Sequence, residues 1–194
     1  MAIEPGDELD RQDMERLASG HGAALNDLME RHGARLFHYL IRQLQDEAEA
    51  EDFAQEAFVR VFQNRHKFDA QYRFSTWLYT IATNLVRDRQ RKQGRHPQVS
   101  LEAENEQTGV GLKDTLPSGG PGPEENLAAQ ERAAAVRQAV AKLPEELRTP
   151  LLLAEYEGRS QKEISVILNC TVKTVEMRIY RARQQLRATL APLL

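Results

Sequence analysis

The spacing of apolar residues predicts a chain built from helices. In the N-terminal part, a single apolar stripe with charges behind it indicates a first helix. The stripe comprises Leu25, Leu28, Met29, His32, Leu36 and Leu40. A second helix, over about residues 48–64, opens with acids that the positive end of the helix dipole favours. Its buried side is expected to comprise Phe53, Ala57, Val61 and Phe62. Residues 1–21 are expected to hold an N-terminal tail and the start of the first helix, with residues 1 to about 12 acidic, polar and mobile.

A third helix is predicted after Phe74, at the end of a segment rich in aromatic residues (68–79). This helix runs into basic residues that only Asp88 opposes: Arg87, Arg89, Arg91, Lys92 and Arg95. Aromatic rings beside a basic helix suit single-stranded nucleic acid, because unpaired bases stack on rings and cations follow the phosphates. The alternative is a core built on Trp77 with a solvated basic end.

Helical spacing stops after this segment. Residues 96–126 show no sustained periodicity, and their run Pro117-Ser-Gly-Gly-Pro-Gly-Pro123 cannot hold a helix or a central strand. We therefore expect a flexible linker, rich in Pro, Gly and acids, between two small helical domains. The domains cover residues 22–95 and 127–194.

The C-terminal part carries the signals of a helix-turn-helix. After predicted helices over 127–143 and 145–157, Ser160-Gln-Lys-Glu163 matches a capping box that starts a short helix. Asn169 tolerates the left-handed backbone of a tight turn. Thr171 can then cap a longer helix whose inward face comprises Val175, Ile179, Ala182 and Leu186. A helical hairpin with a solvated face would explain the turn, but not the basic charge described next.

Charge is strongly segregated, although the 194 residues carry a net charge of only -3. Residues 46–58 contain six acids and no base, whereas residues 158–187 contain seven bases and two acids, a net +5. Such segregation indicates different partners for different faces, with nucleic acid on the basic one. The acidic helix is either a docking surface for a basic partner or a solvated face.

The chain offers little for catalysis or membrane insertion. One cysteine, Cys170, excludes an internal disulfide, and no apolar run approaches the ~20 residues that span a bilayer. Five scattered histidines form no metal or hydrolase motif, so we expect no metal site, no cofactor and no enzymatic activity. A cytoplasmic location is expected.

In this order and spacing, the motifs resemble a bacterial RNA polymerase sigma factor of the extracytoplasmic-function type. The segments that carry the resemblance are 52–58 (DFAQEAF), 74–79 (FSTWLY), 81–84 (IATN), 143–148 (LPEELR) and 174–183 (TVEMRIYRAR). The family consists of two promoter-reading domains, region 2 and region 4, joined by a linker.

The resemblance implies roles for particular residues. Region 2 would recognise and melt the minus-ten element with Phe68, Tyr72, Arg73, Phe74, Trp77, Asn84, Arg87, Asp88, Arg91 and Lys92. The β′ clamp helices of core RNA polymerase would be bound by Asp52, Gln55, Glu56 and Arg60. Region 4 would read the minus-thirty-five element in duplex DNA with Lys173, Thr174, Glu176, Met177, Arg178, Tyr180, Arg181 and Arg183. The polymerase β flap and an anti-sigma factor are further partners implied by the resemblance.

Three positions depart from the family pattern: Asn169, Glu176 and Met177. Glu176 either accepts a hydrogen bond from a cytosine amine in the major groove or forms an ion pair with Lys173, Arg178 or Arg181 on its own helix. Two other functions were weighed. A helix-turn-helix repressor or activator that acts without polymerase would not need the aromatic segment before a basic helix. A nucleic-acid enzyme would need catalytic motifs that the sequence lacks.

Overall fold

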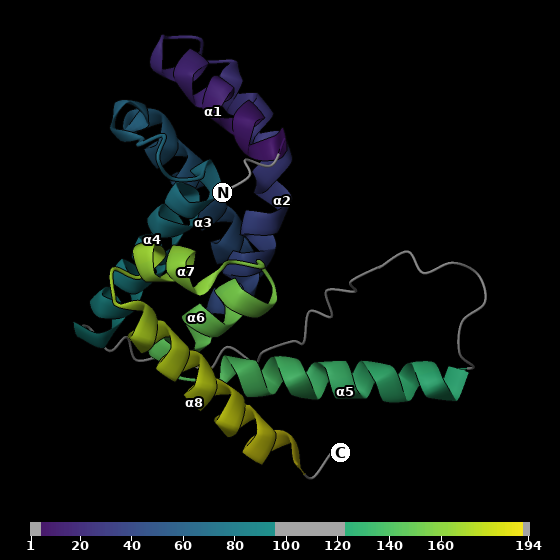
Figure 1. The fold of residues 1–194 in the computed structure, drawn as a ribbon. Helices are drawn as coiled ribbons and strands as arrows, with labels where there is room; N and C mark the ends of the chain where they lie inside the picture. Colours follow the sequence, from purple (N-terminus) through teal and green to yellow (C-terminus); the bar gives the residue numbers. More distant parts are fainter. Residues whose placement is uncertain (1–4, 96–122, 192–194) are drawn as a thin grey trace.

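The computed structural model describes residues 5–95 and 123–191, and in these ranges the chain is entirely helical (Figure 1). The N-terminal half contains α1 (Pro5–Ala18), α2 (Ala24–Leu44), α3 (Glu47–Gln63), a 3-10 turn η1 (Arg65–Lys67) and α4 (Phe74–Arg95). The C-terminal half contains α5 (Pro123–Ala141), α6 (Glu145–Glu155), α7 (Gln161–Ile167) and α8 (Val172–Leu190). The predicted all-α class with two helical parts is confirmed. Most of the predicted linker lies outside the described residues.

Helices α2, α3 and α4 enclose the core of the N-terminal half. Leu36, Leu40, Val61 and Leu78 are fully or almost fully buried there. The turn between α2 and α3 is short because Gln45 adopts a left-handed conformation, with a φ of 57°. Asp46 then starts α3 by accepting a hydrogen bond from the Glu49 amide, at 2.9 Å.

Helix α1 corrects the expectation of a mobile tail. Its apolar residues Met14 and Leu17 are buried against α2. Its acids Asp10 and Asp13 are buried too, and both pair with Arg31 of α2. Two apolar residues are too few to produce a visible period, and buried carboxylates gain their stability from partners that local sequence does not identify. The prediction of a mobile tail was therefore wrong for residues 5–12.

His32 occupies a packing position on α2 rather than a metal site. Its Nε2 lies 2.8 Å from a carboxylate oxygen of Asp10, and its ring lies 5.1 Å from the ring of Phe74. Burial lowers the pKa of His32 to about 4, so the imidazole is neutral at pH 7. A neutral ring stacked on Phe74 links α1 and α2 to the start of α4.

The buried side of α3 differs from the predicted stripe. Phe58 is buried, whereas Phe62 is 42% exposed. The prediction was correct for Ala57 and Val61, which are buried, and wrong for Phe62. Apolar residues fill almost every third or fourth position of α3, so periodicity alone could not fix which of two adjacent faces turns inward.

The helix-turn-helix forms as predicted. The Ser160 hydroxyl accepts from the Glu163 amide, and the Glu163 carboxylate accepts from the Ser160 amide, which completes the capping box. Asn169 has a φ of 50° in the turn, and Thr171 accepts a hydrogen bond from the Thr174 amide. These local signals confirm both helix starts because capping depends only on nearby residues.

The two halves pack against each other, with α7 on α4 and α6 on α2 (Figure 1). Near α7, the Tyr79 hydroxyl donates to the Glu157 carboxylate at 2.5 Å, and both residues are buried. Burial, together with this carboxylate, raises the pKa of Tyr79, so the hydroxyl keeps its proton. Arg159 donates to the Ser75 hydroxyl at 2.7 Å, beside the same tyrosine ring.

A second polar cluster joins α2 to α6. The Gln43 amide group donates to the Thr149 hydroxyl at 3.0 Å and to the Tyr39 hydroxyl at 3.1 Å. Tyr39 also shares a hydrogen bond with Thr83 of α4, at 2.9 Å. All four residues are buried. The contact between the halves therefore rests on satisfied hydrogen bonds among buried polar groups as well as on apolar packing.

Removing the Tyr79 hydroxyl should destabilise the packed arrangement. Tyr79→Phe leaves the buried Glu157 carboxylate without its donor, which typically costs about 1–3 kcal/mol. Thermal unfolding should show a lower melting temperature than the parent protein, whereas Tyr156→Phe, which alters an exposed ring, should show none of this loss. Equal melting temperatures for Tyr79→Phe and the parent would contradict a stabilising role for this contact.

Candidate nucleic-acid interface

Phe68, Phe74 and Trp77 of the aromatic segment form one cluster of tilted and edge-on rings, but the aromatic residues of the segment differ in exposure. The Phe68 ring lies 5.4 Å from Trp77 and 6.3 Å from Phe74. Phe74 is only 1% exposed and belongs to the core, whereas Tyr72 is 49% exposed. The expectation that Phe74 binds an unpaired base directly is corrected, because a buried ring offers no face to a ligand. Phe74 instead packs against Trp77, with the ring centroids 6.3 Å apart, and Tyr72 presents a ring that is exposed to solvent.

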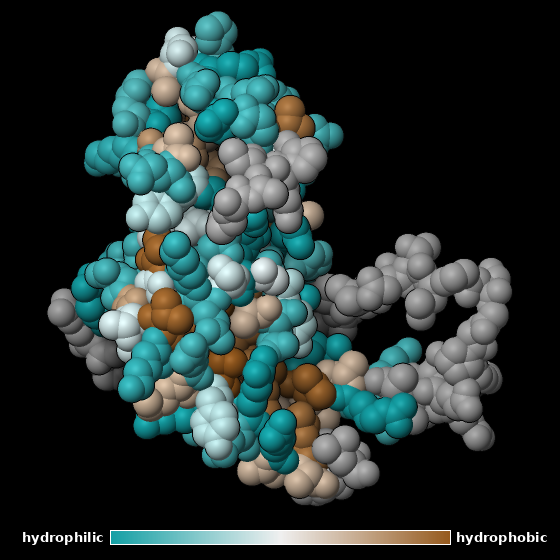
Figure 2. Space-filling view, in the orientation of Figure 1, coloured by the Kyte–Doolittle hydropathy of each residue, from teal (hydrophilic) through white to brown (hydrophobic). Residues whose placement is uncertain are grey.

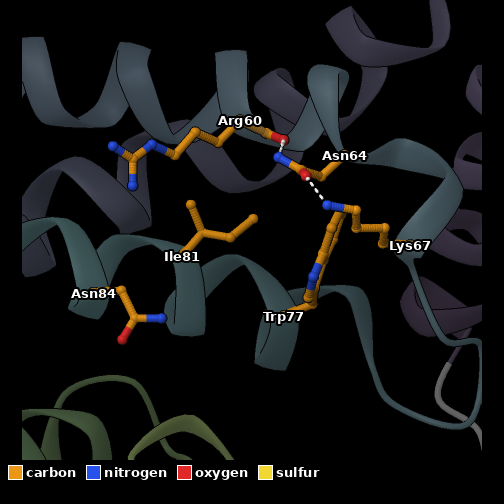
Figure 3. A pocket seen from close by; sticks show the side chains of 6 residues that line it. All are labelled: Arg60, Asn64, Lys67, Trp77, Ile81 and Asn84. Carbon is orange, nitrogen blue, oxygen red and sulfur yellow. Dashed lines mark hydrogen bonds between the residues drawn. The ribbon is translucent and has the colours of Figure 1, made fainter.

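A hollow of about 190 Å³ opens beside Trp77, between α3, η1 and α4 (Figure 3). Its lining comprises Arg60, Asn64, Lys67, Trp77, Ile81 and Asn84. We call it the first hollow. It brings Trp77 and Asn84 together, as expected of a minus-ten site, and adds Asn64 and Lys67, which the sequence reasoning missed. Asn64 follows Arg60 by four residues at the end of α3, which could have indicated it; Lys67 lies in η1, beyond this helical spacing.

The first hollow also changes the place of Arg60. The sequence grouped Arg60 with the acidic residues of the same helix as a polymerase contact. In the structure its side chain lines the hollow with Asn84, and its Nε donates to Glu56 at 2.9 Å. Arg60 thus lies between the acidic surface and the aromatic cluster, and its position favours neither role alone.

A second hollow, of about 230 Å³, also borders Trp77. Its lining comprises Lys67, Asp69, Tyr72, Thr76, Trp77, Thr80 and Val166. Val166 comes from α7, so the C-terminal half forms one wall of a hollow that otherwise belongs to the N-terminal half. Tyr72 and Trp77 supply two aromatic surfaces to this hollow.

The arginines of the predicted minus-ten surface are paired with carboxylates. Arg73 lies 3.0 Å from Asp7, and Arg87 lies 3.2 Å from Glu145. Arg91 pairs with Asp88 at 3.0 Å on the exposed side of α4. The sequence suggested that only Asp88 opposes this basic helix, but acids from α3 and α6 reach it in the fold, where Glu49 pairs with Arg89 and Glu145 with Arg87. Lys92 is exposed.

The acidic surface of α3 is exposed, as predicted for Asp52, Gln55 and Glu56. Beside it, a hollow of about 390 Å³ opens between α2 and α3. Its lining is mostly apolar and includes Met29, Phe37, Ala54 and Phe58, with Glu51 and Gln55 at the edge. An exposed acidic row beside an apolar hollow can bind a basic, partly apolar protein segment.

The recognition helix α8 presents most of its predicted DNA-binding residues to solvent. Lys173, Glu176, Met177, Tyr180, Arg181 and Arg183 are exposed, while Thr174 and Arg178 are half-buried. Arg183 pairs with Glu155 of α6 at 2.5 Å. Among the described residues, Glu176 makes no ion pair, so the structure does not contain the pairing with helix neighbours that was one of the two alternatives for it. In Figure 2, brown residues are most frequent in the lower part of the view, where Figure 1 places α6 and α8, and teal residues lie among them.

Neither a metal centre nor a membrane segment occurs in the described part of the chain. Residues 5–95 and 123–191 hold no group of three or more His, Cys, Asp or Glu side chains that could bind a metal ion. Within the same ranges, no helix is long and apolar enough to span a membrane.

These features define a two-part, DNA-reading transcription protein, with an aromatic surface on one half and a helix-turn-helix on the other. A family model for sigma-70 region 2 matches residues 28–96, and one for sigma-70 region 4 matches residues 133–186. The chain belongs to the sigma-70 family and is a sigma factor of the extracytoplasmic-function class, which directs RNA polymerase to promoters.

Individual relatives cover almost the whole chain. The RNA polymerase sigma-H factor of Pseudomonas aeruginosa is 36% identical over 191 residues, 96% of each chain. The extracytoplasmic-function sigma factor SigW of Bacillus subtilis is 37% identical, over 93% of this chain and 96% of its own. Among solved structures, CnrH in complex with the cytosolic domain of CnrY is 28% identical, with a TM-score of 0.69 over 95% of this chain and 98% of that one.

Replacing Tyr72 with alanine should affect strand binding, whereas replacing Phe74 with alanine should affect stability. Tyr72→Ala removes an exposed ring and should weaken binding of a minus-ten single strand by about tenfold, within the ~1–3 kcal/mol of base stacking, with no change in stability. Phe74→Ala opens a cavity in the core and should lower the free energy of unfolding by about 3–5 kcal/mol. Strand binding by the polymerase holoenzyme and urea unfolding of each variant measure the two effects. Unchanged strand binding by Tyr72→Ala would show that this ring faces no base.

Glu176 should determine the choice of one base pair. If its free carboxylate accepts from a cytosine amine, Glu176→Gln should change the preference at one position of the minus-thirty-five element by about 1–3 kcal/mol. Selection from randomised elements, with Arg187→Gln further along α8 as the control, measures this preference. A consensus identical to that of the parent protein would reject direct reading and leave only a general effect on affinity.

Proposed function

We propose that the N-terminal half binds core RNA polymerase and the opened minus-ten strand, while the C-terminal half reads duplex DNA at the minus-thirty-five element. The proposal rests on one observation: two nucleic-acid surfaces of different kinds occur on one chain. The first consists of aromatic walls and hollows around Trp77, which suit unpaired bases. The second is an exposed, basic recognition helix after a capped turn, which suits a major groove.

The proposed roles need no catalytic group in this chain. Its contribution is to bind polymerase, select a promoter and hold the separated strand, while phosphoryl transfer belongs to polymerase. The partners are therefore core polymerase and promoter DNA, which places the protein in the cytoplasm. The complex between the relative CnrH and a cytosolic protein domain supports a further protein partner, of the anti-sigma kind, for this chain.

The acidic surface on α3 is proposed to bind polymerase through the β′ clamp helices. Asp52 and Gln55 are exposed and lie beside the apolar α2–α3 hollow. Charges at the rim guide association with a basic partner, and the hollow can accept an apolar side chain from it. The β flap is proposed to contact the C-terminal half, as the family resemblance implies.

The packed arrangement of the two halves does not suit simultaneous binding of both promoter elements. Elements a little over two helical turns apart lie about 70–80 Å from each other along the duplex. Here α7 contacts α4 directly, and Val166 lies beside Tyr72 in the second hollow. A coil of about thirty residues spans roughly 30 Å on average, although its limit is near ~100 Å. We propose that binding to polymerase separates the halves and holds the linker extended.

Run-off transcription tests the proposed function directly. Core polymerase with this protein should yield transcripts from defined start sites, and core polymerase alone should not. Template footprints made with the free protein separate this function from that of a repressor. Strong protection of both elements by the free protein at physiological salt would support a repressor or activator that acts without polymerase.

Reversing the charge of the acidic surface should weaken assembly with core polymerase. Asp52→Lys is the cleaner change, because Glu56 already pairs with Arg60 and its reversal would also disturb that arginine. We expect about tenfold weaker assembly and a smaller dependence on salt, because favourable charge pairs are lost. Competition against the parent protein for limiting polymerase measures this, with Glu131→Lys on the exposed side of α5 as the control. Normal assembly by Asp52→Lys would show that this face is only solvated.

A further inference from the structure

The Trp77 side chain lines both the first and the second hollow and so lies between them. Apart from Trp77 itself, the linings of the first and second hollows share only Lys67. The indole is held in place by the Phe68 ring at 5.4 Å and the Phe74 ring at 6.3 Å. A fixed ring that borders two hollows can separate two successive bases when each base stacks on one face of it.

Lys67 lines both hollows together with Trp77, and the side-chain amide of Asn64 orients it. Its Nζ donates to Asn64 Oδ1 at 3.0 Å, and Asn64 Nδ2 donates to the backbone carbonyl of Arg60 at 3.0 Å (Figure 3). The second hydrogen bond fixes which way the amide points, so its oxygen faces the lysine. The ammonium is thereby held at the edge of the Trp77 ring, at the end of η1.

Lys67 also differs in its charge environment from the arginines on α4 and just before it. Arg73, Arg87, Arg89 and Arg91 each pair with a carboxylate. Lys67 is exposed, and within residues 5–95 and 123–191 no ion pair includes it. Asp69 lines the second hollow as well; its carboxylate accepts from the backbone N–H of Gln71 at 2.9 Å and forms no ion pair with Lys67. The positive charge of Lys67 is therefore available to an anion at the point where the two hollows meet.

We propose that Lys67 binds the phosphate that joins two unpaired bases lying on opposite faces of Trp77, and that Asn64 is the residue that positions it. The proposal rests on the proposed binding of the minus-ten strand. When a ring separates two bases, the backbone between them must cross the edge of that ring. Lys67 lies at this edge, where its ammonium can neutralise the phosphate and release a counterion.

The second hollow is narrowed in the packed arrangement because Val166 of α7 forms one of its walls. Two bases can therefore straddle Trp77 only when α7 has moved away from α4. The test uses the polymerase holoenzyme for this reason, since the halves are proposed to separate there. Lys67 is exposed, so its replacement does not threaten the fold.

The experiment is a phosphate scan of the minus-ten single strand that the parent holoenzyme selects from a random pool. One linkage at a time is replaced by an uncharged methylphosphonate, and binding is measured over a range of salt concentrations. The parent should lose about fourfold in affinity at 0.15 M salt when the critical linkage is neutral, which corresponds to a salt slope smaller by ~0.7 for one single-strand phosphate. Lys67→Ala should show the same loss on the unmodified strand and no further loss at that one linkage.

Other variants separate charge from position. Lys67→Arg should restore most of the affinity and the salt slope. Asn64→Ala should lose about twofold in affinity with an unchanged slope, because the charge remains but its place is no longer fixed. Lys142→Ala, an exposed lysine before α6, should behave as the parent.

The outcomes distinguish this proposal from the proposed function. If Lys67→Ala keeps the parent's slope and the parent's penalty at every linkage, Lys67 does not bind a strand phosphate and the inference is overturned. If the parent holoenzyme binds no single strand at all, it is the proposed minus-ten function that fails.

Discussion

Helix α4 must satisfy three environments at once, and this constraint sets the arrangement of the molecule. One face carries Leu78 and Ala82 into the core of the N-terminal half. Another presents Ser75 and Tyr79 to the C-terminal half, where Glu157 and Arg159 bind them. The remaining face lines the hollows around Trp77. Because α4 is held on two faces, its third face is rigid enough to position a ligand.

Local signals predicted much of this fold because local chemistry produces it. The capping box, the left-handed Asn169 and the Thr171 cap all depend on residues at most three positions apart, and each forms as expected. The helix-turn-helix was therefore predictable in detail. Helix α1 was not, because buried acids that pair with Arg31 of the next helix look like a solvated tail in the sequence.

The candidate site was predicted in outline, and its errors share one physical cause. Aromatic residues and a basic helix correctly indicated the region around Trp77. Exposure of single rings, however, depends on how α4 meets α2, and this turned Phe74 inward and left Tyr72 outside. Partners also come from far along the chain, as with Arg87 and Glu145. Counting charges along the basic helix therefore overstated the number of cations without a carboxylate partner. Lys67, which donates to Asn64, has no sequence motif that would have indicated it.

The polar character of the contact between the halves bears on how it can open. Its buried groups, such as Gln43 with Thr149 and Tyr79 with Glu157, are hydrogen-bonded in the packed arrangement. On separation, water replaces each partner, so the net cost per hydrogen bond is only about 0.5–1.5 kcal/mol. An apolar contact would cost roughly 25 cal/mol for every Å² exposed, with no compensating partner in water. On the proposed function, polymerase has to supply the cost of exposing the apolar part of the contact but only this modest cost for its polar part, while the same hydrogen bonds help to keep the halves of the free protein packed.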